Sequence, residues 1–129
     1  MKELEKLINE LKKIKGVKAI YLFGSYAKAE QLPLSDIDLC VIADKDIDEK
    51  VKSDITSNSS EKIDVSLFWD LPIMIRYKVL KEGKILFLRD ERFLHLITTE
   101  TLREYFDFQP VIERFGEVYF GDRKWIEKE

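Results

Sequence analysis

The sequence is poor in cysteine, histidine, glycine and proline, with one, one, five and three of them in 129 residues. A single cysteine, Cys40, excludes an internal disulfide, and it has no second cysteine or nearby histidine with which to bind zinc. We therefore expect Cys40 to be a small buried hydrophobic side chain. Because no stretch is low in complexity, we expect an ordered chain except at its last few residues.

The sequence also lacks a long hydrophobic run and an extended basic face. Met1 is followed by Lys-Glu-Leu-Glu rather than by an apolar leader, which predicts a cytoplasmic protein without membrane contact. The net charge is −3. Proteins that follow a nucleic-acid backbone usually present a basic surface, so we expect no direct nucleic-acid binding.

The pattern of apolar residues predicts alternating helices and strands. A length of 129 residues and a hydrophobic content of 45% suit one domain with a real core. We divide it into a core over 1–90 and a helical extension over 91–129 that packs on the core, on a partner, or on both. Together the elements predict an α/β or α+β fold, a small mixed sheet flanked by helices. The predicted helices cover 3–14, 47–55, 72–80 and 91–120, and the predicted strands cover 17–23, 36–42, 62–68 and 84–88.

Gly24-Ser25 follows the first predicted strand and opens a short predicted helix. Glycine allows a ligand to approach the backbone closely, and a helix start offers free N–H groups and a positive dipole end. This junction is a candidate phosphate site, to which Ser25 adds a hydroxyl. An ordinary turn and helix cap is the alternative, and the pair alone does not exclude it.

Three carboxylates are candidate ligands for Mg²⁺. Asp36 and Asp38 open a predicted strand, so both point to one face, roughly 6.7 Å apart along the backbone. Held together, two like charges favour a bound cation, although a strand with one wet face is the alternative. Asp64 lies in the middle of another predicted strand. If the two strands are neighbours, Asp64 can bind a second metal ion or accept a proton from an attacking hydroxyl.

The order and spacing of these motifs resemble the nucleotidyltransferase superfamily that includes DNA polymerase β. The match is closest to its minimal nucleotidyltransferase (MNT) branch, on Gly-Ser-Tyr-Ala-Lys-Ala from Gly24 and Ser-Asp-Ile-Asp-Leu from Ser35. The branch usually has Arg and Gly where this sequence has Lys28 and Ala29. Lysine keeps the charge but loses bidentate phosphate contact. The resemblance implies a polymerase β-like fold, ATP as substrate and two Mg²⁺ ions. The implied site is Asp36, Asp38 and Asp64 for metal and catalysis, with Gly24, Ser25, Lys28 and Ser35 for the nucleotide.

The segment 102–110 is similar to the C-terminal helix of MntA-type antitoxins, which are encoded with HEPN-domain RNase toxins. That family transfers AMP from ATP to a tyrosine of the toxin. The resemblance therefore implies an antitoxin whose partner is a HEPN-type toxin, or a second copy, bound through the last helix. Two alternatives remain: a non-catalytic module that neutralises its partner sterically, and transfer to a small molecule by a homodimer.

Several further residues have both a structural and a functional interpretation. The aromatic stripe on the last helix predicts either packing on the N-terminal helix or docking of a partner, and Pro110 predicts a kink or division there. Lys45 is a candidate phosphate contact, although a solvated lysine is commoner. We expect His95 to be a surface residue. We expect Trp69 and Trp125 to be packing residues rather than platforms for a base.

Overall fold

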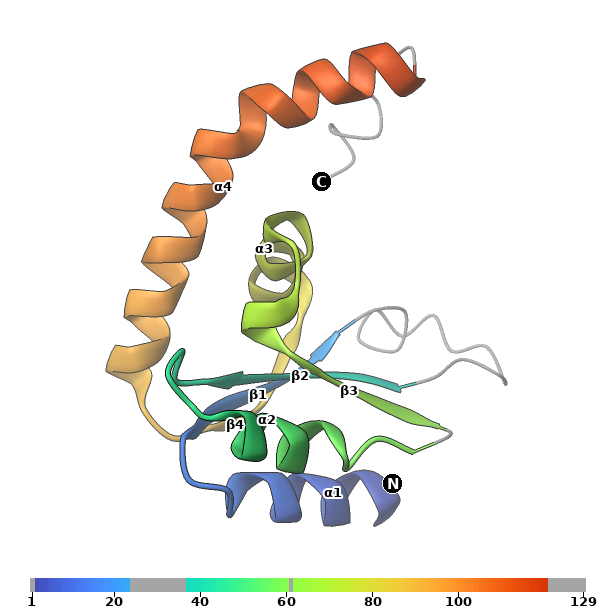
Figure 1. Cartoon of the computed structure of the whole chain (residues 1–129), viewed down its shortest axis with the longest axis vertical. Coiled ribbons are helices and arrows are strands. Elements are labelled where there is room, and N and C mark those ends of the chain that lie inside the picture. The colour runs from blue at the N-terminus through green and yellow to red at the C-terminus, as the bar shows by residue number, and fades with distance from the viewer. Residues whose placement is uncertain (1, 24–36, 61, 121–129) are drawn as a thin grey trace.

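The computed structural model describes residues 2–23, 37–60 and 62–120, and for 109–120 the backbone alone. The fold is a four-stranded sheet with helices on both faces (Figure 1). The elements run in the order α1 (Lys2–Lys12), β1 (Val17–Phe23), β2 (Ile37–Ala43), α2 (Glu49–Thr56), β3 (Ile63–Leu67), the 3₁₀ turn η1 (Phe68–Asp70), α3 (Ile73–Glu82), β4 (Lys84–Leu88) and α4 (Glu91–Phe120).

The sheet is mixed, with strand order β3-β2-β1-β4. β1 pairs antiparallel with both β2 and β4, and β2 pairs parallel with β3. A parallel pair needs a crossover connection, which α2 provides between β2 and β3. The predicted mixed sheet flanked by helices is therefore confirmed.

One face of the sheet is covered by α1 and α2 (Figure 1). The apolar residues of α1 recur at helical spacing, which gives it one buried stripe, and Leu7 and Leu11 are buried there. Ile55 of α2 is also buried. The strands contribute their alternate residues to this layer: Val17, Ile20, Leu22, Ile37, Leu39, Val41, Ala43, Ile63, Val65 and Leu67.

The opposite face carries α3 and α4 (Figure 1). Its core joins Val79 of α3 and Ile97 of α4 to Tyr21, Cys40 and other strand residues. Cys40 is buried, as predicted, and burial raises the pKa of its thiol. The neutral thiol is thus a packing group rather than a reactive one.

The four helices and four strands predicted by residue range are confirmed with boundaries that differ by a few residues, and β1 has the predicted bounds. The short helix predicted to begin at Ser25 lies outside the described residues. Figure 1 shows that α4 changes direction along its length. Of the two alternatives expected at Pro110, a kink or a division, the division is wrong, because α4 is one continuous helix from Glu91 to Phe120. Nor does α4 fold back on the N-terminal helix. It packs on α3 and β1, across the sheet from α1.

Among the described residues, no helix combines the length and the apolar character needed to cross a membrane.

A buried hydroxyl in α4 lacks a hydrogen bond. Thr101 is completely buried between α4 and the core, and within the described part of the chain its Oγ1 has no hydrogen-bond partner. Thr99, two residues earlier, is exposed, and its hydroxyl donates to the His95 carbonyl oxygen at 2.9 Å. A buried polar group without a partner destabilises the folded state.

We predict that Thr101→Val raises the free energy of unfolding by about 1–2 kcal/mol, because it removes this unpaired hydroxyl and keeps the shape of the side chain. Urea unfolding measures the change. Thr99→Val is the matched control, and we expect its effect to stay within about 0.5 kcal/mol. Equal effects of the two substitutions would contradict the assignment.

Candidate active site

Asp38 and Asp64 lie side by side on neighbouring strands. In the parallel pairing of β2 with β3, Asp38 is the register partner of Asp64. Neighbouring strands are about 4.8 Å apart, and paired positions direct their side chains to the same face. Asp38 is partly exposed and Asp64 is exposed. The condition on which the sequence prediction depended, that these strands are neighbours, is therefore met.

The alternation of the strands determines which face receives the carboxylates. Ile37 and Leu39 flank Asp38, and Ile63 and Val65 flank Asp64. All four are buried in the layer between the sheet and helices α1 and α2. Asp38 and Asp64 must therefore point to the opposite face. Further along β2, Cys40 and Ile42 share that face and are buried by α3 and α4, which leaves the carboxylates at its open end.

The end of β1 lies next to the same carboxylates. Phe23, its last residue, pairs with Asp38. The chain thus leaves β1 beside Asp38, and it enters β2 at Ile37, directly before Asp38. The remaining predicted site residues fall on the segment between these two points. Gly24, Ser25, Lys28, Ser35 and Asp36 lie outside the described residues, and their roles stay predictions.

Two serines stabilise the strand that carries Asp64. Val65 N–H donates to Ser59 Oγ at 3.0 Å, and Ile63 N–H donates to Ser60 Oγ at 3.3 Å. β3 is an edge strand, so the amides on its outer side would otherwise lack a partner. The serines thus fix the backbone on both sides of Asp64. They lie in the connection between α2 and β3, and only the edge position of β3 reveals their role.

The described carboxylates fit a hard divalent cation. Mg²⁺ prefers carboxylate and phosphate oxygens and often binds one or two protein carboxylates with its remaining ligands from water or substrate. Asp38 and Asp64 supply two of the three predicted carboxylates. No group of three or more His, Cys, Asp or Glu suited to a metal ion occurs among the residues whose placement is described, and Asp36 is not one of these.

The structure moves one candidate away from the site. Lys45 lies beyond the last residue of β2, Ala43, whereas Asp38 is near its start. Ala43 and Asp38 are about 16 Å apart at the strand rise, so a contact of Lys45 with phosphates at the carboxylates is wrong. The alternative, an exposed lysine, fits the structure, since the Lys45 side chain is 55% exposed. His95 is exposed on α4, as expected. Trp69 packs edge-on against Phe68, with ring centroids 5.1 Å apart, and Trp125 lies outside the described residues.

Sequence comparison relates most of the chain to one enzyme family. Residues 5–92 match the family model described as polymerase beta, nucleotidyltransferase. Over 68 residues the chain is 35% identical to the "putative protein adenylyltransferase" of Methanocaldococcus jannaschii. That alignment covers 53% of this chain and 53% of the relative, so it spans about half the length of the curated protein.

Solved structures share the fold over nearly the whole chain. A toxin–antitoxin crystal structure with AMP-PNP has a TM-score of 0.64 at 24% identity, over 88% of this chain and 96% of the other. A tri-AMPylated HEPN toxin of Shewanella oneidensis in complex with an MNT antitoxin gives 0.62 at 23%, over 88% and 95%. At these identities the likeness concerns the fold.

We predict that Mg²⁺ raises the melting temperature and that Asp64→Asn removes most of this increase, because the cation offsets the repulsion between two carboxylates on adjacent strands. Thermal unfolding with Mg²⁺ and with a chelator measures it. Asp70→Asn is the control, since Asp70 is exposed in η1, at the opposite end of β3. An unchanged increase in Asp64→Asn would exclude Asp64 as a ligand.

Proposed function

The chain belongs to the polymerase beta nucleotidyltransferase family, and from this premise we propose that it transfers AMP from ATP to a tyrosine hydroxyl of a HEPN-type toxin. The observation that carries the proposal is the pairing of Asp38 with Asp64 at the open end of one sheet face. The name of the archaeal relative and the fold shared with toxin–antitoxin complexes support the choice of a protein acceptor. In this pair the chain is the antitoxin.

The proposed roles follow the chemistry of the side chains. Asp36 and Asp38 would hold the metal, and Asp64 would bind the second ion or accept the proton of the attacking hydroxyl. When bound, two Mg²⁺ ions would neutralise negative charge on the triphosphate and on the leaving pyrophosphate. The acceptor oxygen forms a bond to the α-phosphorus of ATP. At the same time the bond breaks between that phosphorus and the oxygen it shares with the β-phosphorus. Pyrophosphate leaves, and the acceptor becomes an AMP ester.

The nucleotide is proposed to bind along the segment between β1 and β2. Gly24 and Ser25 would contact the triphosphate through backbone N–H groups and the serine hydroxyl. Lys28 would contribute a point charge, and Ser35 a hydroxyl directly before the metal-binding pair. The support is that both ends of this segment lie at the carboxylates, since Phe23 pairs with Asp38.

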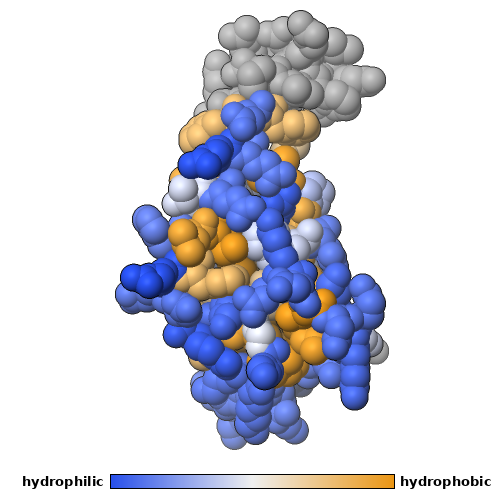
Figure 2. Space-filling model, turned by 60° about the vertical axis from the view of Figure 1, so that its left-hand side comes forward, coloured by the Kyte–Doolittle hydropathy of each residue, from blue (hydrophilic) through white to orange (hydrophobic). Residues whose placement is uncertain are grey.

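A surface for the acceptor protein is proposed on α4. Ile97, Thr101 and Tyr105 recur every four residues and are buried against the core, with Ile97 and Tyr105 only 6% exposed. Phe108 follows Tyr105 by three residues and so lies close to the same stripe, yet it is 40% exposed. The apolar stripe of α4 thus extends past the residues that cover it, and Figure 2 shows hydrophobic side chains amid the hydrophilic surface on this side. Phe106, which is 55% exposed, lies nearby on the helix.

We predict that co-expression with the toxin gives the toxin an adenylate-sized mass increase, and that Asp38→Asn with Asp64→Asn abolishes it. Intact-mass spectrometry of the purified toxin measures the adduct. Asp70→Asn should modify the toxin like the unsubstituted protein. A toxin that is neutralised without any adduct would instead establish the alternative, a non-catalytic module that acts by steric contact.

We predict that Phe108→Asp weakens binding to the toxin at least tenfold, because it places a charge in an apolar contact. Isothermal titration calorimetry measures the dissociation constant, and circular dichroism checks that α4 is retained. Ile85→Asp is the control, because Ile85 is 49% exposed but lies on β4. If Ile85→Asp weakened binding and Phe108→Asp did not, the acceptor surface would lie on the sheet edge.

A further inference from the structure

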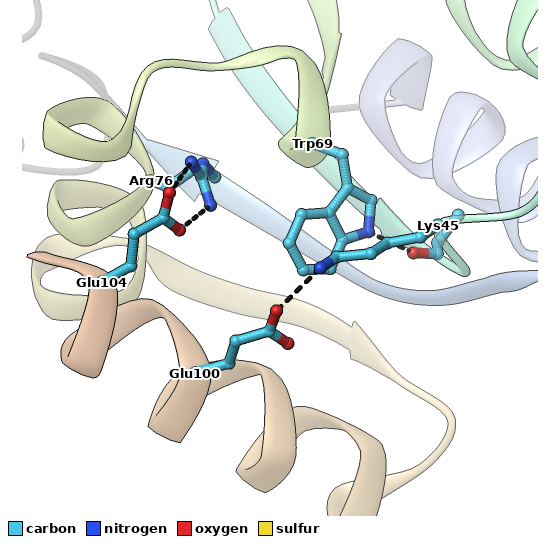
Figure 3. Close-up of polar contacts among 6 residues, drawn as sticks. Lys45, Trp69, Arg76, Glu100 and Glu104 are labelled. Carbon is cyan, nitrogen blue, oxygen red and sulfur yellow. Dashed lines mark hydrogen bonds and ion pairs between the residues drawn. The ribbon is translucent and has the colours of Figure 1, made fainter.

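Five residues from four parts of the chain form a polar cluster between α4 and the core (Figure 3). We name it the α4 clamp: Lys45, Trp69, Arg76, Glu100 and Glu104. At its centre, Trp69 Nε1 donates a hydrogen bond to the Ala43 carbonyl oxygen at 2.7 Å. Because Trp69 follows β3 and Ala43 ends β2, this bond joins the ends of the two strands.

Lys45 connects this centre to α4. Its Nζ lies 4.4 Å from the centroid of the Trp69 ring and 2.7 Å from Glu100 Oε1. A cation held between an aromatic face and a carboxylate is attracted from both sides. Lys45 and Glu100 are both about half exposed, so their attraction alone is weak and sensitive to salt.

Arg76 of α3 makes the second connection. Its two terminal nitrogens donate to the Glu104 carboxylate at 3.0 and 3.3 Å, a two-point contact that defines direction as well as distance. Its Nε donates to the Leu71 carbonyl oxygen at 3.0 Å. Only 12% of the Arg76 side chain is exposed, and its bond to Leu71 holds the guanidinium from a side other than Glu104.

The clamp adds polar contacts to an apolar contact that already selects the buried face of α4. Ile97 and Tyr105 are buried, and the Tyr105 ring stacks on Tyr77 of α3 with the ring centroids 3.8 Å apart. Glu100 and Glu104 lie one helical turn apart, and each meets a cation from a different element. Rotation or sliding of α4 by one residue would break both ion pairs. The clamp therefore contributes to fixing the rotation and height of α4 on the core.

The clamp is also connected to the candidate active site through β2 and β3. Ala43 lies on the strand that carries Asp38, and Trp69 lies two residues beyond the end of the strand that carries Asp64. Along β2, Ala43 is five residues, or about 16 Å, from Asp38. The clamp thus attaches α4 near the ends of β2 and β3 that lie opposite Asp38 and Asp64.

We propose that Lys45, Arg76, Glu100 and Glu104 are positioning residues, which orient α4 so that a protein acceptor bound on it reaches the carboxylates. This inference rests on the proposed function only where the acceptor is concerned. The clamp lies at the ends of β2 and β3 opposite Asp38 and Asp64, so breaking it should impair use of the protein acceptor and leave ATP binding unchanged.

The first experiment measures the position of α4 without any acceptor. Spin labels at Lys50→Cys in α2 and Arg103→Cys in α4 report their separation by double electron–electron resonance. Both positions are exposed, whereas the native Cys40 is buried and stays unlabelled. We expect Glu100→Lys with Glu104→Lys to broaden or shift the distance distribution. An unchanged distribution would overturn the proposal.

The second experiment uses a charge swap and steady-state kinetics. Glu100→Lys alone should raise KM for the toxin about tenfold without changing the dissociation constant of ATP, and Lys45→Glu together with Glu100→Lys should restore most of the loss. Glu91→Lys, an equal charge change on the same helix outside the clamp, should behave like the unsubstituted protein. A loss of ATP affinity, or a swap that restores nothing, would overturn the positioning role.

The two experiments separate this inference from the proposed function. If the unsubstituted protein modifies no toxin, the proposed function fails, and the distance measurement still decides whether the clamp positions α4. If the toxin is modified equally well by the protein with Glu100→Lys and Glu104→Lys, the clamp inference fails and the proposed function stands.

Discussion

The parallel register between β2 and β3 is the constraint on which the candidate site depends. This register places Asp38 directly beside Asp64. The burial of Ile37, Leu39, Ile63 and Val65 between the sheet and helices α1 and α2 maintains the register. A slip of one residue would turn the carboxylates into the core and the apolar side chains into water. The hydrophobic core therefore defines the site, although none of its side chains takes part in the proposed chemistry.

Two kinds of contact hold α4, and they have different consequences. Apolar burial through Ile97 and Tyr105 attaches the helix and selects which of its faces is buried. The ion pairs of the α4 clamp are directional, and their glutamates are about half exposed. On the core side the clamp includes Trp69, which is hydrogen-bonded to β2, and Arg76. A helix held in this way can present a partner protein at a defined distance from the ends of β2 and β3 that carry the carboxylates.

Much of this arrangement could be predicted from local sequence patterns, and the remainder depends on tertiary contacts. The strand that carries Asp64 was predicted over 62–68, and the apolar run 17–23 predicted β1. No local signal shows which face of the sheet α4 covers, so its packing on α3 was missed. Lys45 was placed near the site because it is close to Asp38 in sequence, whereas β2 separates them. The serines that stabilise β3 have a role only because β3 is an edge strand.

The most direct test of this account is the location of a bound paramagnetic ion. In amide NMR spectra, Mn²⁺ added with a non-hydrolysable ATP analogue should broaden the resonances of Asp38 and Asp64 most strongly. Trp69, at the opposite end of the strands, should be affected least. Broadening centred on the α4 clamp or on α1, with Asp38 and Asp64 unaffected, would contradict the assignment of the carboxylate pair as the reaction centre.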